Sequence, residues 1–312
     1  MSIESVERVE AGVTPVVRRI DWLNVVGISS YHLLAALAFF PWFFSWTGVA
    51  LMAAGIYVFG TLGINLCYHR LLTHRGFVCP KWLEHTLAIL AVCSFQDTPA
   101  RWVAVHRRHH EHADDEPDPH SPLISFLWAH VGWLLVTSPD MERMQIYSRY
   151  AKDIVRDPFY KWLDRPGVYL AFILGSWAAF YFAGLLGALA FGMTLGEAMQ
   201  FGLSLLVWGV FVRTVIVWHI TWSVNSVTHM WGYRSYETGE ESRNNILIGL
   251  ISNGEGWHNN HHHDPRSARH GFEWWEIDVT YLSLRLLALL GLAEKIAEPR
   301  RSREAVSEQP AE

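Results

Sequence analysis

Two long stretches of the chain carry almost no charge. No lysine, arginine, aspartate or glutamate occurs from Asn24 to His69, and Glu197 is the only charged residue from Gly167 to Val212. A helix needs about 20 mainly apolar residues to cross a bilayer. Each stretch is therefore long enough for two membrane-spanning helices, joined by a short link that makes them antiparallel neighbours.

This pattern predicts an all-α integral membrane protein with four transmembrane helices. We expect the spans to cover about residues 24–44, 47–68, 168–191 and 199–222. The polar segments 1–23, 69–166 and 223–312 then lie on one side of the membrane. Because the links on the other side contain no lysine or arginine, the positive-inside rule predicts that these segments and both termini are cytoplasmic.

The cytoplasmic segments are expected to form one helical cap over the spans. Residues 24–297 would form a single domain, between an N-terminal tail with an interfacial segment (1–23) and a disordered C-terminal tail (298–312). Two apolar runs, Leu83–Phe95 and Pro122–Thr137, are too short to span comfortably. We expect both runs to lie on the membrane or to dip into it.

Composition narrows the class of function. The chain of 312 residues is 51% hydrophobic with a net charge of −5, and its basic residues are scattered, so nothing indicates nucleic-acid binding. Its three cysteines, Cys67, Cys79 and Cys93, lack CxxC spacing, which argues against a disulfide scaffold and against an iron–sulfur site. Motifs for dinucleotide, nucleotide or haem binding and for a serine hydrolase are absent from the sequence. Redox chemistry would therefore need electrons from a partner protein.

The histidines are the candidate metal ligands of this sequence. If the segment HRRHH is helical, His109 lies about 60° to one side of His106 and His110 about 40° to the other, so three imidazoles point from one face at one spot. Neutral imidazole is a common ligand of transition metals. Taken alone, this motif is equally consistent with a basic, solvated helix face.

Nine of the 17 histidines fall into four groups on the same predicted side of the membrane. The groups are HRLLTH (His69, His74), HRRHH (His106, His109, His110), NSVTH (Asn225, His229) and HNNHH (His258, His261, His262). Nine nitrogen ligands exceed the needs of one tetrahedral site, so we expect two metal ions of higher coordination. Imidazole alone permits iron, copper, nickel or zinc, and copper is the strongest competitor by affinity.

The motifs resemble the membrane fatty-acid desaturase family, which includes stearoyl-coenzyme A desaturase, and within it the bacterial and cyanobacterial Δ9 acyl desaturases. The resemblance is carried by YHRLLTHRGF (68–77), FQ (95–96), WVAVHRRHHEHADDEPDPHSP (102–122), AHVGWLL (129–135), WSVNSVTHMWG (222–232) and NGEGWHNNHHHDPRSARHGFEWWEID (253–278). It implies a multi-pass enzyme of the bacterial inner membrane with two non-haem iron ions. The enzyme would use O2 and two electrons from an external donor, such as ferredoxin, rubredoxin or a cytochrome b5-type protein, to introduce a cis double bond into a long-chain acyl group.

The resemblance also implies roles for single residues. One iron would take His69, His74, His106 and neighbouring residues, and the other would draw on His110, His229, His258 and the remaining histidines of the motifs, with Asn225 reaching a metal through water. Trp222 would meet the head end of the acyl chain, and Gln96 would line the bend of its tunnel. Tyr57 and Thr61 lie about 18 and 12 Å along the second span from His69, where the methyl end would stop, although ordinary helix packing explains them equally well.

Polar residues beside the histidines are expected to support them. Asp118 and Glu255 would orient ligand imidazoles by accepting a hydrogen bond from the ring nitrogen that does not face the metal, and His120 would lie next to the ligands. Asp114 and Asp115 are expected to form a solvated acidic surface instead.

One departure from the family concerns the acyl carrier. Relatives that use coenzyme A carry an Arg-Asp pair before the second histidine motif, whereas this chain has Ala104-Val105. The carrier, whether coenzyme A, a carrier protein or a glycerolipid, therefore stays open. A hydroxylase on the same scaffold is an alternative, and a histidine-rich metal transporter is a weaker one because transporters place their ligands at mid-bilayer.

Overall fold

The computed structural model describes residues 18–115 and 118–300, so most of both predicted tails lies outside the described residues. Within the described residues the chain is mostly helical. Two short strands, β1 (Arg19–Ile20) and β2 (Val136–Thr137), pair antiparallel with Arg19 opposite Thr137. The predicted all-α class is confirmed.

In the described part of the chain, four helical segments are long and apolar enough to cross a membrane, as predicted. They are α1 (Trp22–Ala35) with the 3-10 turn η1 (Ala36–Phe39), α2 (Trp46–Gly55) continuing as the π-helix η3 (Ile56–Thr73), α8 (Pro166–Ala190), and α9 (Leu195–Leu206) continuing through the π-helix η6 (Val207–Val212) into α10 (Arg213–Val227). The second and fourth spans run past their predicted ends, to Thr73 and Val227.

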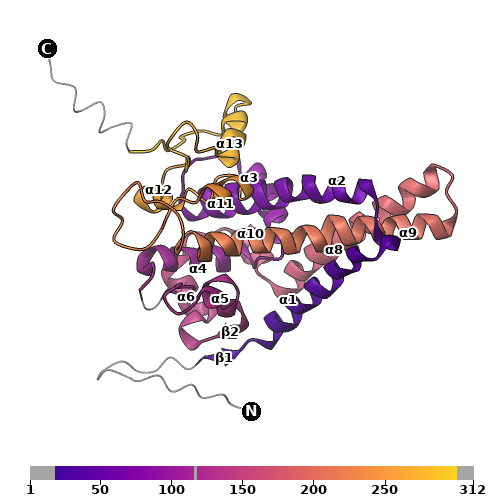
Figure 1. The fold of residues 1–312 in the computed structure, drawn as a ribbon, viewed down its shortest axis with the longest axis horizontal. Coiled ribbons are helices and arrows are strands. Elements are labelled where there is room, and N and C mark those ends of the chain that lie inside the picture. Colours follow the sequence, from indigo (N-terminus) through magenta and orange to yellow (C-terminus); the bar gives the residue numbers. More distant parts are fainter. Residues whose placement is uncertain (1–17, 116–117, 301–312) are drawn as a thin grey trace.

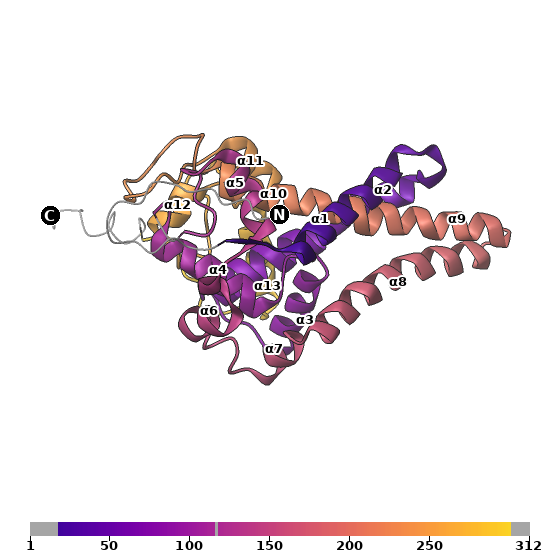
Figure 2. The same cartoon turned by 90° about the horizontal axis from the view of Figure 1, so that it is seen from below.

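The spans extend away from the cap on one side of the molecule, as Figures 1 and 2 show. The third and fourth spans pack closely through glycine. A Cβ atom on Gly184 would lie only 2.8 Å from the Cα of Gly202, so a larger residue there would force the helices apart. Close approach through small residues is how membrane helices gain packing contacts without a hydrophobic driving force.

The cap consists of residues 74–165 and 228–300. Its helices are α3 (Lys81–Val92), α4 (Pro99–His112), α5 (Phe126–His130), α6 (Arg143–Tyr150), α7 (Pro158–Leu163), α11 (Ile246–Ile251), α12 (His258–His263) and α13 (Val279–Leu289), with 3-10 turns η4 (Gly132–Leu135) and η5 (Pro139–Met141); a further turn, η2 (Pro41–Phe43), joins the first two spans. The predicted run Leu83–Phe95 corresponds to α3. The run Pro122–Thr137 instead breaks into α5, η4 and β2.

The first residues of the predicted C-terminal tail, 298–300, make hydrogen bonds to the preceding chain. Tyr281 donates a hydrogen bond to Glu298 at 2.6 Å, and the backbone N–H of Arg300 donates to Asp264 at 3.0 Å. Residues 298–300 are therefore held against the cap.

A buried apolar core fixes the elements that carry the histidines. Leu66 and Leu72 of the second span and Val103 of α4 are nearly inaccessible to solvent and belong to one hydrophobic cluster. Trp257 anchors the start of α12: it is fully buried, and its indole donates to the carbonyl of Ile277 at 2.9 Å. The second span, α4 and α12 are thereby held in fixed positions around the site.

Candidate metal centre

Nine histidines from four segments meet in the cap near the ends of the second and fourth spans. They form two groups, within each of which one ring nitrogen of every member lies within 4.8 Å of the others. The five-histidine group consists of His69, His74, His106, His110 and His261, and the four-histidine group consists of His109, His229, His258 and His262. All nine predicted histidines are thus brought together, divided between the two groups.

Helix α4 contributes to both groups. The Nε2 atoms of His106 and His110, one turn apart, lie 3.1 Å from each other. The centroid of the His109 ring lies 5.9 Å from the centroid of the His106 ring. The sequence predicted that the three imidazoles point at one spot, and this prediction is wrong. His110, expected with the second metal, lies in the five-histidine group. The cause is helical geometry, since the roughly 100° between His109 and His110 turns them toward different groups.

Helix α12 divides its histidines in the same way. The Nε2 atoms of His258 and His262 are 3.1 Å apart and lie in the four-histidine group. His261, between them, turns to the five-histidine group, where its Nε2 lies 3.1 Å from that of His69 and 3.0 Å from that of His110. The two helices therefore hold the groups side by side.

The short contacts between imidazole nitrogens are better explained by metal ions bound between the rings than by hydrogen bonds from ring to ring. A neutral imidazole has one N–H, and the Nδ1 of His69 uses its proton on Glu255 at 2.5 Å, which leaves a lone pair on Nε2. That lone pair faces the Nε2 of His261. The Nε2 atoms of His74 and His109 are buried and have no hydrogen-bond partner among the described residues. Converging, unpaired imidazole nitrogens are the donor set that transition metals prefer, so the residues fit such ions.

Burial keeps most of these imidazoles neutral. It is the main cause that lowers the pKa well below the usual range, with further lowering by neighbouring imidazoles, for His74, His106, His110, His258, His261 and His262. In His109 burial also opposes the charged form, but the Asp118 carboxylate outweighs it and raises the pKa. Neutral imidazoles present lone pairs at pH 7 without having to lose a proton first.

Carboxylates contact the outer nitrogens of the four-histidine group. Asp118 accepts a hydrogen bond from Nδ1 of His109 at 3.0 Å, and Asp114 accepts one from Nδ1 of His229 at 3.1 Å. Glu240 lies 3.6 Å from Nδ1 of His262. Burial would raise the pKa of Asp118, but the neighbouring His109 lowers it overall.

The expectation of a solvated surface at Asp114 and Asp115 is half wrong. Asp115 is exposed, but Asp114 is 5% exposed and also accepts the backbone N–H of Glu241 at 2.7 Å. The sequence reading missed Asp114 because it lies in an acidic run, which is typical of surface loops. His120, at 2% exposure, lies beside His109 with ring centroids 4.3 Å apart, and burial lowers its pKa to about 3.

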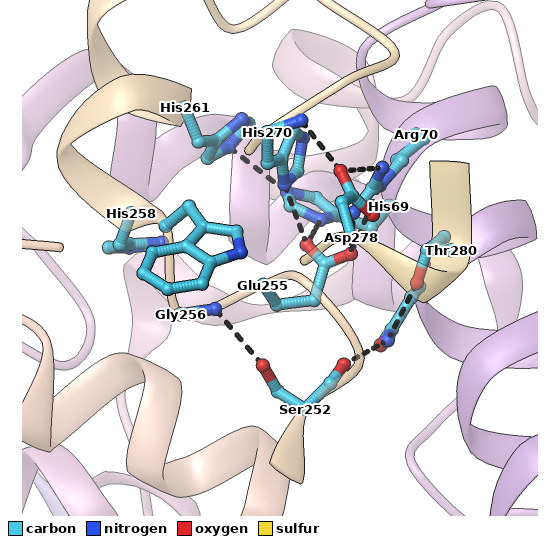
Figure 3. A network of polar contacts seen from close by, with 12 residues as sticks. His69, Arg70, Ser252, Glu255, Gly256, His258, His261, His270, Asp278 and Thr280 are labelled. Carbon is cyan, nitrogen blue, oxygen red and sulfur yellow. Dashed lines mark hydrogen bonds and ion pairs between the residues drawn. The ribbon is translucent and has the colours of Figure 1, made fainter. Parts of the chain in front are cut away.

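An ion-pair network supports the five-histidine group (Figure 3). Arg70, next to His69 in the second span, donates to Glu255 at 2.8 Å and to Asp278 at 2.8 Å. Glu255 therefore joins Arg70 to His69. His270 is fully buried at this point; its Nδ1 lies 3.2 Å from Glu255 but not in hydrogen-bonding geometry.

Sequence reasoning did not find Arg70, Asp278 or His270. Arg70 carried the clearest available signal, because an arginine at the end of an apolar helix needs a partner.

Three of the residues expected to contact substrate lie along the spans, and the fourth, Gln96, lies in the loop between α3 and α4. Trp222 is 5% exposed, and its indole N–H makes no hydrogen bond within residues 18–115 and 118–300. Gln96 donates to the hydroxyl of Thr221, beside Trp222, at 3.1 Å. Farther along the second span, Thr61 accepts a hydrogen bond from Asn253 at 2.7 Å, and the hydroxyl of Tyr57 lies 2.8 Å from that of Ser283.

Four apolar spans beneath two buried histidine groups define a multi-pass membrane protein with a centre suited to two metal ions. The chain matches the fatty acid desaturase family model over residues 41–281. It is 40% identical over 295 residues to an sn-2 palmitoyl-lipid 9-desaturase of Nostoc sp. (strain 36), covering 92% of this chain and 93% of that protein.

Two further relatives agree with this match. The chain is 41% identical over 278 residues to an sn-1 stearoyl-lipid 9-desaturase of Anabaena variabilis, covering 89% and 94% of the two proteins. It is 38% identical over 279 residues to an acyl-CoA C20 Δ5-desaturase of Anemone leveillei, covering 89% and 82%. The protein belongs to the fatty acid desaturase family and is a membrane oxidoreductase that desaturates fatty acyl chains. The resemblance found in the sequence is confirmed, and the transporter and hydroxylase alternatives are not favoured.

Proposed function

We propose that this enzyme introduces a cis double bond at the Δ9 position of a saturated acyl chain esterified in a membrane glycerolipid. The cyanobacterial relatives named above as acyl-lipid 9-desaturases support both the position and the carrier. Ala104-Val105, in place of the Arg-Asp pair of enzymes that use coenzyme A, supports the glycerolipid over acyl-coenzyme A. A glycerolipid substrate would reach the spans from within the bilayer.

The division of the nine histidines into groups of five and four carries the proposal that two iron ions are bound. Each group would hold one iron, and Asn225 would contribute through water. Asn225 lies one turn before His229, and its amide makes no hydrogen bond within the described part of the chain, so it is available to bind a water molecule. When bound, the irons would supply the O2 chemistry that removes hydrogen from an unactivated methylene.

The protein's own residues would position the acyl chain. Trp222 would donate its unpaired indole N–H to the ester carbonyl at the head end. Gln96, which is hydrogen-bonded to Thr221, the residue before Trp222, would line the bend of the acyl-chain tunnel. Thr61 and Tyr57 would form the wall at the methyl end, held in place by their hydrogen bonds to Asn253 and Ser283.

The cap would face the bacterial cytoplasm, with both termini on that side of the inner membrane. A soluble carrier such as ferredoxin or rubredoxin, or a cytochrome b5-type protein, would supply two electrons there. Asp118 and Glu255 would keep the Nδ1 protons of His109 and His69 fixed, so that their Nε2 atoms face the metal.

Expression in a host that lacks its own desaturase tests this proposal. Mass spectrometry of separated lipid classes, with double bonds located by fragmentation, should find Δ9 products first in glycerolipids rather than in the acyl-coenzyme A pool. His110→Ala and His262→Ala should each abolish the product. Unsaturated product that persists in both variants, or that appears first on coenzyme A, would contradict the proposal.

A further inference from the structure

Three histidines outside the metal centre form a hydrogen-bonded string across three elements. Nε2 of His32 in α1 lies 3.1 Å from Nε2 of His219 in α10, and Nδ1 of His219 lies 3.0 Å from Nε2 of His130 in α5. At its ends the string reaches the carbonyl of Ile28, 2.8 Å from Nδ1 of His32, and the hydroxyl of Ser226, 3.0 Å from Nδ1 of His130. Every ring nitrogen in the string therefore has a partner.

The protons of the two outer rings follow from the ends of the string. A carbonyl can only accept, so Nδ1 of His32 carries the proton and its Nε2 has a lone pair. The Ser226 hydroxyl donates its only proton to the carbonyl of Trp222 at 2.8 Å, so Nδ1 of His130 donates to Ser226 and its Nε2 also has a lone pair. His219 lies between these two lone pairs and, as a neutral ring with one N–H, donates to one of them at a time.

The three rings surround Trp222. His32 stacks on it with ring centroids 6.4 Å apart and an interplanar angle of 21°. His219 and His130 meet it edge-on, at 5.0 Å and 5.7 Å. Trp218 stacks on it as well, at 5.6 Å. The indole plane is thus fixed by contacts from α1, α5 and α10, while its N–H makes no hydrogen bond within the part of the chain that the structure describes.

We propose that the string His32–His219–His130 is a positioning device for Trp222, which sets how far the head end of the acyl chain lies from the metal centre. This inference rests on the proposed function, in which Trp222 holds that head end. Because a displacement of about 1 Å can cost about 100-fold in rate, a fixed indole would select which methylene pair reacts. The string would therefore determine the position of the double bond.

His219→Leu tests the proposal because it removes both central contacts of the string and is compatible with the exposed position of His219 on a spanning helix. His219→Gln, which keeps a donor and an acceptor, is the conservative variant. His85→Leu is a matched control: His85 also stacks on an aromatic ring, Phe159 at 4.0 Å, and bonds to a carboxylate, Asp157 at 3.1 Å, but lies away from Trp222. Each variant is purified in detergent with its iron and supplied with O2 and a reduced electron carrier, and double-bond positions, KM and iron content are measured.

His219→Leu is expected to raise the share of product with a displaced double bond, and the KM for the acyl lipid, each by about 10-fold, equivalent to about 1.4 kcal/mol. Iron content should stay at the wild-type value, His219→Gln should restore the wild-type position, and His85→Leu should change neither quantity. A uniform loss of rate with the bond position unchanged would overturn the proposal. An inactive wild-type enzyme would instead refute the proposed function.

Discussion

The five-histidine and four-histidine groups use the same kind of ligand but are supported by different charges. The five-histidine group contacts one carboxylate, Glu255, whose charge is balanced by Arg70. The four-histidine group contacts three, Asp114, Asp118 and Glu240, and none of these forms an ion pair with lysine or arginine within residues 18–115 and 118–300.

This difference indicates two ways of holding a cation. A carboxylate behind an imidazole fixes its ring and makes its other nitrogen a stronger donor. The group with fewer histidines therefore compensates with negative charge, whereas the group with more histidines relies on ligand number and on a neutralised, buried network. The two metal positions should differ in how they respond to loss of a ligand, of a carboxylate or of a counter-ion.

Loss of a ligand should have the largest effect, and an unequal one. His258→Ala would leave three histidines in its group, whereas His74→Ala would leave four in the other. Product formation should fall at least about 100-fold in both variants. This is the largest effect typical of removing a residue that only supports a ligand, and loss of the ligand itself should cost at least as much. After dialysis against a chelator, plasma mass spectrometry should find less iron in His258→Ala than in His74→Ala. Equal retention of iron would show that the groups do not differ in this way.

Removal of the counter-ion should destabilise the fold around the five-histidine group. Arg70→Met would leave Glu255 and Asp278 as unpaired charges in the protein interior. Loss of one partner from a buried ion pair costs about 3–5 kcal/mol. Thermal unfolding in detergent should show a clearly lower midpoint for this variant. Arg285→Met, which removes an exposed arginine of α13, should leave the midpoint unchanged, and equal midpoints for the two variants would argue against the network.

Sequence reasoning reached the parts of this comparison that depend on local pattern. The four spans follow from the absence of charge over long stretches, and the nine histidines follow from spacing within single helices. The division of the histidines into two groups could not be predicted from the sequence, because the position of His110 depends on where α4 lies between the second span and α12. The partners of Arg70 could not be predicted either, because Glu255 and Asp278 lie 185 and 208 residues after it in the chain.

Neutralising one carboxylate should weaken the four-histidine group selectively. Asp114→Asn keeps the shape of the side chain but removes its charge from His229. Loss of such a supporting residue typically lowers metal affinity about 10–100-fold. Competition with a chelator should show weaker binding of one of the two irons. The adjacent, exposed Asp115→Asn is the matched control; a similar loss there would mean that general surface charge, and not the contact to His229, holds the metal.

The smallest effect should come from a partly exposed ion pair at the edge of the five-histidine group. Arg107, between His106 and His110 in sequence, donates to Asp153 at 2.7 Å and to the carbonyl of Thr73 at 3.1 Å. Burial would raise the pKa of Asp153, but hydrogen bonds from Arg107 and Arg75 outweigh it and lower the pKa overall. Because the folded-state pKa lies below the unfolded value of about 3.9, the contribution is complete above that pH and is lost as the pH falls through the folded-state pKa.

The contribution should be about 1 kcal/mol or less, since the Asp153 side chain is 37% exposed and solvent screens the pair. The free energy of unfolding of Asp153→Asn should therefore fall less steeply with acid than that of the wild type. Protonation of the metal ligands affects both proteins alike, so the difference between the two pH profiles isolates Asp153. Parallel profiles would mean that the five-histidine group gains no support from this outer pair and depends on the buried network alone.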